Sequence, residues 1–222
     1  MENRLRDSQL AALGKLLAGY THELKNHLAI INESSGLMDD LLEMSEGGDD
    51  KLHERFKKII ITIGERISQA NTMAMYLNRV AHRMDVPAST FNVNDLLIEE
   101  LALMNRFAAM KQISFELNLQ EDIPSLYNNP SLLQFMIFSL VNELLETLES
   151  GSAIRFFSSM REQDVEIIIE SGSAPVDNGD ELVASGQMSQ ILDFAAGKMN
   201  IGFNRQVSGG EHLKFTLTLP IG

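Results

Sequence analysis

Apolar side chains recur at spacings of three and four residues through the first part of the chain, the repeat of a helix that buries one face. One such run lies within residues 5–44, which contain no proline, and a second lies within residues 52–84, before Pro87. Residues 45–50 between them combine two glycines with serine and acidic residues, a composition typical of a turn. The pattern predicts two long antiparallel helices that form a hairpin domain over residues 1–86.

A hairpin of two helices leaves apolar stripes that a further surface must cover. Because sustained heptad-like stripes favour helical bundles, we expect a homodimer whose two hairpins form a four-helix bundle. The alternative is that the stripes pack against the second domain of the same chain. The predicted stripes run through Leu10, Leu13, Leu17, Tyr20, Leu24, Ile31 and Met38, and through Leu52, Phe56, Ile59, Ile63, Ile67, Ala70, Ala74, Leu77, Ala81 and Met84.

After Pro87 short alternating segments and amphipathic helical segments follow one another, so the pattern changes to mixed α/β. We expect Asn94 to cap the first helix of this part and Pro130 to lie in the first turn of the second. The order of elements predicts an α+β fold in which helices cover one face of a mixed sheet, over residues 87–222. The expected strands are 89–93, 113–119, 153–159, 165–170, 200–207 and 213–219, and the expected helices are 95–111, 130–148 and 188–196.

The composition of the chain excludes several classes of binding partner and of cellular setting. The 222 residues carry 31 acidic and 18 basic side chains, a net charge of −13 that disfavours nucleic acid and anionic membrane surfaces as partners. With no cysteine, the chain has neither disulfides nor thiolate metal sites. No apolar run reaches the roughly 18 residues needed to cross a bilayer, and the first residues are too polar for a secretory signal. We therefore expect a soluble cytoplasmic protein.

One histidine of the first predicted helix stands away from the apolar stripe. At about 100° per residue, His22 lies about 200° from Tyr20 and from Leu24, so we expect it to point outward. Asn26 follows one turn later beside it, and Glu23 is its immediate neighbour. A largely neutral, exposed imidazole can attack phosphorus with one ring nitrogen while a carboxylate accepts the departing proton. These residues are therefore candidates for phosphoryl transfer.

The other four histidines have no comparable setting. His27 lies nearer the apolar stripe, and we expect it to be a partly buried packing residue. His53, His82 and His212 are scattered along the chain, so no metal site is predicted. A lone surface histidine on a helix usually has no chemical role, and that interpretation stays open for His22.

The segment His22-Glu23-Leu24-Lys25-Asn26-His27-Leu28 resembles the phosphoacceptor box of the sensor histidine kinases. That box reads histidine, acid, two variable residues, asparagine or threonine, proline and leucine, and only the proline differs here. The resemblance implies that His22 is phosphorylated and that Glu23 assists removal of its proton. It also implies that Asn26 helps position water when a partner's receiver domain is dephosphorylated.

The second domain resembles the family's ATPase-like α/β sandwich in a degraded form. Asn142 falls where the magnesium-binding asparagine stands in that module. The first glycine box corresponds to residues 170–174, where Glu170 replaces the adenine-binding aspartate and Gly172 is the one glycine that remains. The later glycine-rich box has no recognisable counterpart. The resemblance implies that Asn142, Glu170 and Gly172 bind nucleotide only if ATP is bound at all.

Charge adds a second argument against ATP. The sequence has no lysine or arginine between Lys111 and Arg155, or between Arg161 and Lys198, the two segments expected to border the pocket. Few cations and few glycine amides would then meet a triphosphate. We therefore expect no cofactor, with ATP and Mg²⁺ as the alternative.

A retained histidine beside a decayed ATP site predicts a phosphorelay protein, similar to bacterial histidine phosphotransferases derived from kinases. In this interpretation His22 takes a phosphoryl group from an aspartyl phosphate on one response-regulator receiver domain and passes it to another. Receiver domains and a second copy of the chain are then the expected partners. Three alternatives stay open: an active but divergent sensor histidine kinase, a non-catalytic receiver-binding scaffold, and a receiver phosphatase.

Overall fold

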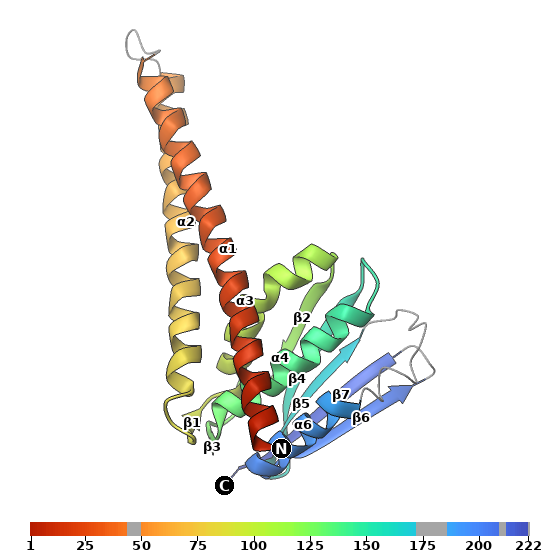
Figure 1. Cartoon of the computed structure of the whole chain (residues 1–222). Coiled ribbons are helices and arrows are strands. Elements are labelled where there is room, and N and C mark those ends of the chain that lie inside the picture. Colours follow the sequence, from red (N-terminus) through yellow and green to blue (C-terminus); the bar gives the residue numbers. More distant parts are fainter. Residues whose placement is uncertain (44–49, 172–185, 209–211, 222) are drawn as a thin grey trace.

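The computed structural model describes residues 1–43, 50–171, 186–208 and 212–221. Helices α1 (Glu2–Glu43) and α2 (Asp50–Arg83) form an antiparallel hairpin that extends well beyond the remaining elements (Figure 1). Those elements, the α/β half, are β1 (Ser89–Phe91), α3 (Val93–Lys111), β2 (Ser114–Leu119), β3 (Leu126–Asn128), α4 (Pro130–Thr147), β4 (Ala153–Arg161), β5 (Asp164–Ser171), α6 (Gly186–Met199), β6 (Gly202–Ser208) and β7 (His212–Pro220).

The α/β half is built on a five-stranded sheet in the order β2-β4-β5-β7-β6. Strands β2 and β4 are parallel and the other neighbours are antiparallel, while β1 and β3 form a separate antiparallel pair. Every second side chain is buried along β5, along β7 and along the first part of β4, as expected for strands with one covered face. Helices α3, α4 and α6 cover that face (Figure 1), so the predicted α+β class is confirmed.

The start of α3 differs by two residues from the prediction. Asn92 is the N-cap, and its side-chain oxygen accepts hydrogen bonds from the backbone N–H groups of Asn94 and Asp95. Asn94 lies inside the first turn instead, where its side chain bonds the backbone of Gln120 and the hydroxyl of Ser158. The prediction of Asn94 as the cap was wrong because both asparagines suit the position, and only the chain's entry angle separates them. Strand β3 was not predicted.

The N-terminal half of α1 and the C-terminal end of α2 pack into the core of the α/β half. Leu5, Ala12 and Leu16 of α1 and Val80 of α2 are buried in the same apolar cluster as α3 and α4. The chain's own second half therefore covers residues of the hairpin that lie outside the predicted stripes, while Leu10 and Leu17 of the first stripe stay exposed.

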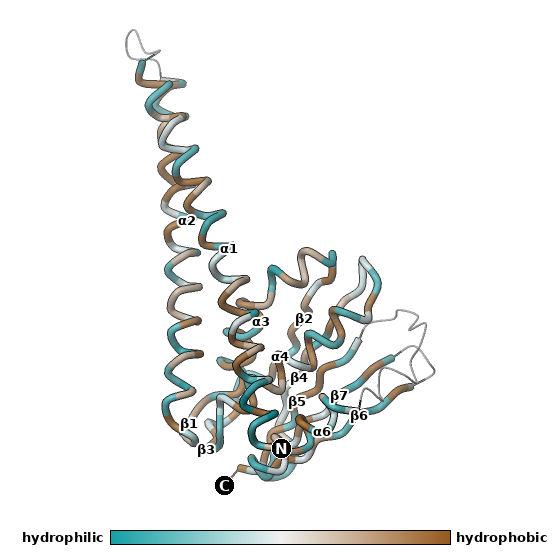
Figure 2. Tube along the Cα trace, in the orientation of Figure 1, coloured by the Kyte–Doolittle hydropathy of each residue, from teal (hydrophilic) through white to brown (hydrophobic). Residues whose placement is uncertain are grey.

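Further along the hairpin, apolar side chains remain exposed, and Figure 2 shows hydrophobic positions continuing along both helices above the α/β half. The predicted stripe of α2 is buried or half-buried from Leu52 to Ile63, but its next member, Ile67, is exposed. The apolar residues of α1 and α2 therefore lie on two faces: one face is buried inside the hairpin, and the other is exposed on its outside. The most exposed of them are Leu28, Leu37, Leu42, Ile60, Ile61 and Ile67.

Within the described residues, no helix is both long enough and apolar enough to span a bilayer.

Two adjacent glutamates of α3 lie buried where α2 meets the α/β half. Glu99 pairs with Arg79 and Arg83 of α2. Glu100 is fully buried and accepts a hydrogen bond of 2.6 Å from the side-chain amide of Gln134 on α4. Burial raises the pKa of the Glu100 carboxyl to about 7, although the Gln134 hydrogen bond and the charge of Arg83 both act to lower it.

This raised pKa predicts that Glu100 makes the fold sensitive to pH. In the unfolded chain the carboxyl has its ordinary pKa near 4.5, so the folded state holds the proton more tightly. The contribution of Glu100 to stability is then fully present below about pH 4.5 and is lost as pH rises to about 7, by about 3 kcal/mol in all. We expect Glu100→Gln to remove this loss, because a neutral amide can still accept from Gln134.

Chemical unfolding at pH 5 and pH 8 checks this expectation. Wild-type protein should lose more stability between the two values than Glu100→Gln, and the variant should be the more stable one at pH 8. The exposed Glu121 offers the matched control, since Glu121→Gln removes the same charge from the surface. Equal pH dependence of wild type and Glu100→Gln would contradict the role of Glu100.

Candidate functional site

The segment that resembles a phosphoacceptor box, His22 to Leu28, lies near the middle of α1, where the hairpin passes the far end of α3, and is called the box below. His22 and Asn26 are exposed on neighbouring turns, while Glu23 is half-buried. His27 is 6% exposed, more deeply buried than predicted, and its Nδ1 atom has no hydrogen-bond partner among the described residues. The ring of His22 is thus open to a visiting molecule, and the ring of His27 is not.

Helix α3 contacts α1 one turn before His22 and again beside it. A Cβ atom on Gly19 would lie 2.7 Å from Cζ of Phe107, so a larger residue at this position would force the Phe107 ring to move. Next to Phe107, the guanidinium of Arg106 reaches Glu23, with Nη1 and Oε2 3.6 Å apart. A cleft of about 390 Å³ opens beside this pair, between α1, α2 and α3. The box therefore borders a contact between the hairpin and the α/β half.

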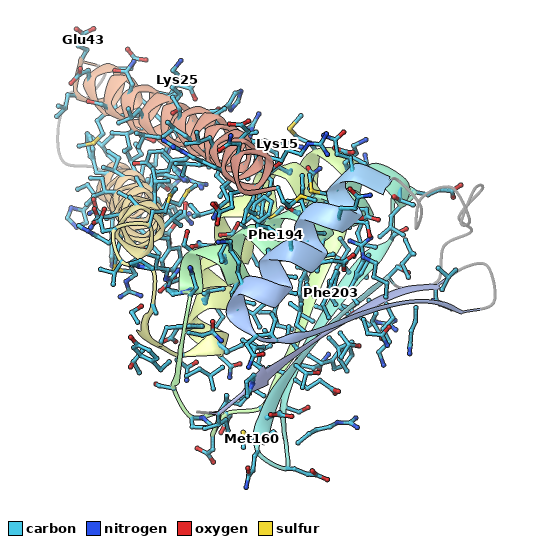
Figure 3. All side chains as sticks on the ribbon, turned by 60° about the horizontal axis from the view of Figure 1, so that its bottom comes forward. Lys15, Lys25, Glu43, Met160, Phe194 and Phe203 are labelled. Atoms are coloured by element: carbon cyan, nitrogen blue, oxygen red, sulfur yellow. The ribbon has the colours of Figure 1, made fainter. Side chains whose placement is uncertain are left out.

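Asn142 lies on α4, a helix whose start is set by Asn129, which caps the N–H of Leu132, and by Pro130 in the first turn. Its side-chain oxygen accepts a hydrogen bond from Lys15 of α1, and its NH₂ donates to Glu146 at 2.8 Å. The three side chains border a cleft of about 480 Å³ between α1 and α4. Figure 3 shows Lys15 on the part of α1 that lies over the α/β half, with Lys25 and Glu43 further along the helix.

Two basic side chains lie near this cleft although they come from outside the two segments that lack lysine and arginine. Lys15 is one, and its Nζ also lies 3.7 Å from Oε1 of Glu146. Arg205 of β6 is the other, with its guanidinium 5.0 Å from the ring centre of Phe203. Partial burial raises the pKa of Glu143, and the charge of Arg205 acts in the opposite direction. The fold therefore adds a cation of α1 to the lining of this cleft, beside Glu143 and Glu146, which the count along the second half of the chain did not include.

The structure does not bring Glu170 together with Asn142. Along β5 the buried side chains alternate with half-buried ones, and Glu170 belongs to the half-buried set that faces away from the helices. Ser171, on the helix-covered face, is buried, and its hydroxyl accepts from the N–H of Leu213 at 2.9 Å. Gly172 lies outside the described residues. No group of three or more potential ligands among the described residues could hold a metal ion.

Sequence reasoning missed Arg106 and Lys15 as neighbours of the two candidate sites. The sequence signal for a contact at this place is the four-residue spacing of Lys15, Gly19 and Glu23. This spacing puts a cation, a residue without a side chain and an anion on one face of α1, where another helix can pack closely. Nothing near Arg106 in the sequence points to the box, because the contact joins residues far apart in the chain.

Comparisons with known proteins find histidine kinases both as sequence relatives and as structural neighbours. No family model matches the chain. Sporulation kinase E of Bacillus subtilis strain 168 is 26% identical over 165 residues, which are 74% of this chain and 21% of that protein. The chain thus spans about a fifth of the length of that relative.

Solved histidine kinases have the same fold. The histidine kinase AdeS of Acinetobacter baumannii superposes with a TM-score of 0.52 and 13% identity, over 90% of this chain and 98% of the other. The histidine kinase ThkA, solved in complex with the response regulator protein TrrA, matches with a TM-score of 0.51 and 14% identity, over 100% of this chain and 65% of the other. The predicted histidine-kinase resemblance is confirmed, both in sequence relatives and in the arrangement of hairpin and α/β half.

The close approach of α1 and α3 beside the box predicts unequal effects of two glycine substitutions in α1. Gly14 has open space around it, so Gly14→Ala should stabilise the protein by about 1 kcal/mol through helix propensity. Gly19→Ala has the same propensity gain but forces the Phe107 ring to move, which costs about 1–3 kcal/mol. Thermal unfolding should therefore rank Gly14→Ala above wild type and Gly19→Ala at or below it.

Phe107→Ala serves as the background that isolates the contact. With the ring removed, Gly19→Ala should regain the benefit that Gly14→Ala shows. If Gly19→Ala stabilised the wild-type chain as much as Gly14→Ala, the packing of α1 on α3 beside the box would be wrong.

Proposed function

We propose that this chain, which has the relatives and the fold of the sensor histidine kinases, is a phosphotransfer protein whose His22 exchanges a phosphoryl group with aspartates of receiver domains. The observation that carries the proposal is the exposed imidazole of His22 on a long helical hairpin, with Asn26 exposed one turn beyond it. The matching solved kinase ThkA is held in a complex with a response regulator protein, which supports a receiver as the partner.

The transfer needs a nucleophile that a receiver can approach. A ring nitrogen of His22 attacks phosphorus, the bond between phosphorus and the aspartate oxygen breaks, and the aspartate leaves as a carboxylate with the bonding electrons. The proton on the other ring nitrogen then passes to a carboxylate or to water. Burial of His27 argues against it as the acceptor, because a receiver's aspartate cannot reach it without opening the helix packing.

Transfer without ATP is the finer part of the proposal. Its support is that Asn142 already bonds Lys15 and Glu146, and that Glu170 faces the other side of the sheet. Glu143 and Glu146 add negative charge beside Asn142, which disfavours a triphosphate.

An active histidine kinase is the second candidate function. Two observations favour it: the relatives are kinases, and Lys15 adds a cation to the cleft beside Asn142. ATP and Mg²⁺ would then bind near Asn142 and Glu146.

Two labelled donors separate these functions. We expect purified protein to take label from a panel of receiver domains charged with radiolabelled acetyl phosphate, and to take none from radiolabelled ATP with Mg²⁺. Label from ATP would replace the relay with the kinase. A chain that took no label yet sped the loss of phosphate from the receivers would be a receiver phosphatase.

Two histidine variants test which ring carries the phosphoryl group. His22→Gln should reduce labelling by at least about 100-fold, since it removes the nucleophile. His27→Gln is the matched control from the same helix and should keep most of the labelling, after correction for any loss of folded protein. Label that survived His22→Gln would exclude His22 as the acceptor.

We further propose that two copies pair through the exposed apolar face of the hairpin to form a four-helix bundle. Ile60 and Ile67 lie two turns apart on the same side of α2, and they are 57% and 47% exposed. Such a face on both helices suits burial against a second hairpin.

Light scattering of the purified protein tests the dimer. Wild type should have the mass of two chains, and Ile60→Lys combined with Ile67→Lys should have the mass of one, because four lysines would face one another across the bundle. Leu117→Lys on the edge strand β2 is the matched control, since Leu117 is also exposed but lies outside the hairpin. A monomeric wild type would exclude the bundle.

A further inference from the structure

One ion pair joins the phosphoacceptor box to the α/β half. Nη1 of Arg106 on α3 lies 3.6 Å from Oε2 of Glu23, and the two side chains are only 20% and 32% exposed. Both partners are therefore partly shielded from water, where opposite charges attract more strongly than at an open surface.

Packing on either side of Arg106 keeps the pair in place. The neighbouring Phe107 ring lies against Gly19, and the ammonium group of Lys15 is 5.7 Å from the centre of the same ring. Lys15, Gly19 and Glu23 are spaced by four residues, so they form one face of α1 that lies on α3. The backbone next to Arg106 is thus held against α1 at the level of the box.

The pair determines where the Glu23 carboxylate lies. Adjacent residues of a helix project about 100° apart, so the Glu23 carboxylate can point towards His22 or towards α3 but not towards both. In the structure it reaches Arg106, and no hydrogen bond joins it to His22 among the described contacts. We propose that Arg106 is a positioning residue that holds Glu23 away from His22, and so restrains transfer while α3 is docked on α1.

This inference rests on the proposed phosphotransfer function of His22 and adds a residue to it. When Nε2 of His22 attacks phosphorus, the ring becomes cationic and its Nδ1 proton must leave. The Glu23 carboxylate can accept that proton, and become a carboxylic acid, only if it rotates towards the His22 ring. Arg106 competes for the same carboxylate, so removing its charge frees the proton acceptor. The α/β half thereby acts on the transfer step through α3.

A small phosphoryl donor tests the step without any receiver. Phosphoramidate transfers its phosphoryl group to an imidazole nitrogen as the P–N bond breaks and ammonia leaves, and intact-protein mass spectrometry follows the phosphorylated chain. We expect Arg106→Gln to raise the rate of His22 phosphorylation about two- to fivefold, the range for a part-exposed ion pair. A rate equal to or below that of wild type would overturn the proposal.

Three further variants separate positioning from a merely structural role. Arg106→Lys keeps the charge and should return the rate towards wild type. In a Glu23→Gln background, Arg106→Gln should have no effect, because the competing carboxylate is gone. Lys111→Gln removes the same charge from the exposed end of α3 and should leave the rate unchanged. An equal gain in the Glu23→Gln background would also overturn the proposal.

Salt offers a measurement that needs no substitution of Arg106. Raising KCl from about 0.05 M to about 0.5 M screens the pair, so the wild-type rate should rise relative to that of Glu23→Gln. The same salt response in both proteins would count against the restraint. The tests of Arg106 and of the phosphotransfer function have separate outcomes. The proposed function is wrong if no phosphorylated receiver labels His22, whatever effect Arg106→Gln has on the reaction with phosphoramidate.

Discussion

Helix α1 packs along its N-terminal half against α3 and α4, and this contact determines where the segment from His22 to Leu28 lies. Leu5, Ala12 and Leu16 are buried in the core of the α/β half, so the lower turns of α1 cannot rotate freely. With that face fixed by burial, the helical repeat leaves His22 in solvent and turns Glu23 towards α3. The exposure of one ring is thus a consequence of apolar packing several turns away.

Charges at the same interface give it a defined register. Glu99 meets two arginines of α2, and the fully buried Glu100 bonds Gln134 of α4. Burying carboxylates costs free energy that such partners offset only in part, so these groups add little net stability. Their geometric demands are strict, however, because a shift of α2 would leave Glu99 charged, buried and unpaired. The hairpin and the α/β half are therefore joined in one particular arrangement.

The cleft beside Asn142 shows how this arrangement changes the chemistry of the second half. In the sequence Asn142 stands among acidic and apolar residues, whereas in the structure Lys15 bonds its side-chain oxygen. Helix α1 of the hairpin thus lines one side of this cleft and adds the charge of Lys15 to it. The family resemblance, by contrast, implies nucleotide-binding residues in the second domain alone. The same docking brings Arg106 to Glu23, so both candidate sites lie between the two halves of the chain.

The sequence by itself determined the hairpin, the α+β class and the outward direction of His22, because each depends on local periodicity and turn residues. It did not separate Asn92 from Asn94 as the cap of α3, since the choice depends on how the chain enters the helix. Only the tertiary structure decided that Glu170 faces away from Asn142 and that Arg106 meets Glu23. Such pairs join residues distant in the chain, and their approach is set by the burial of apolar faces, which no local pattern records.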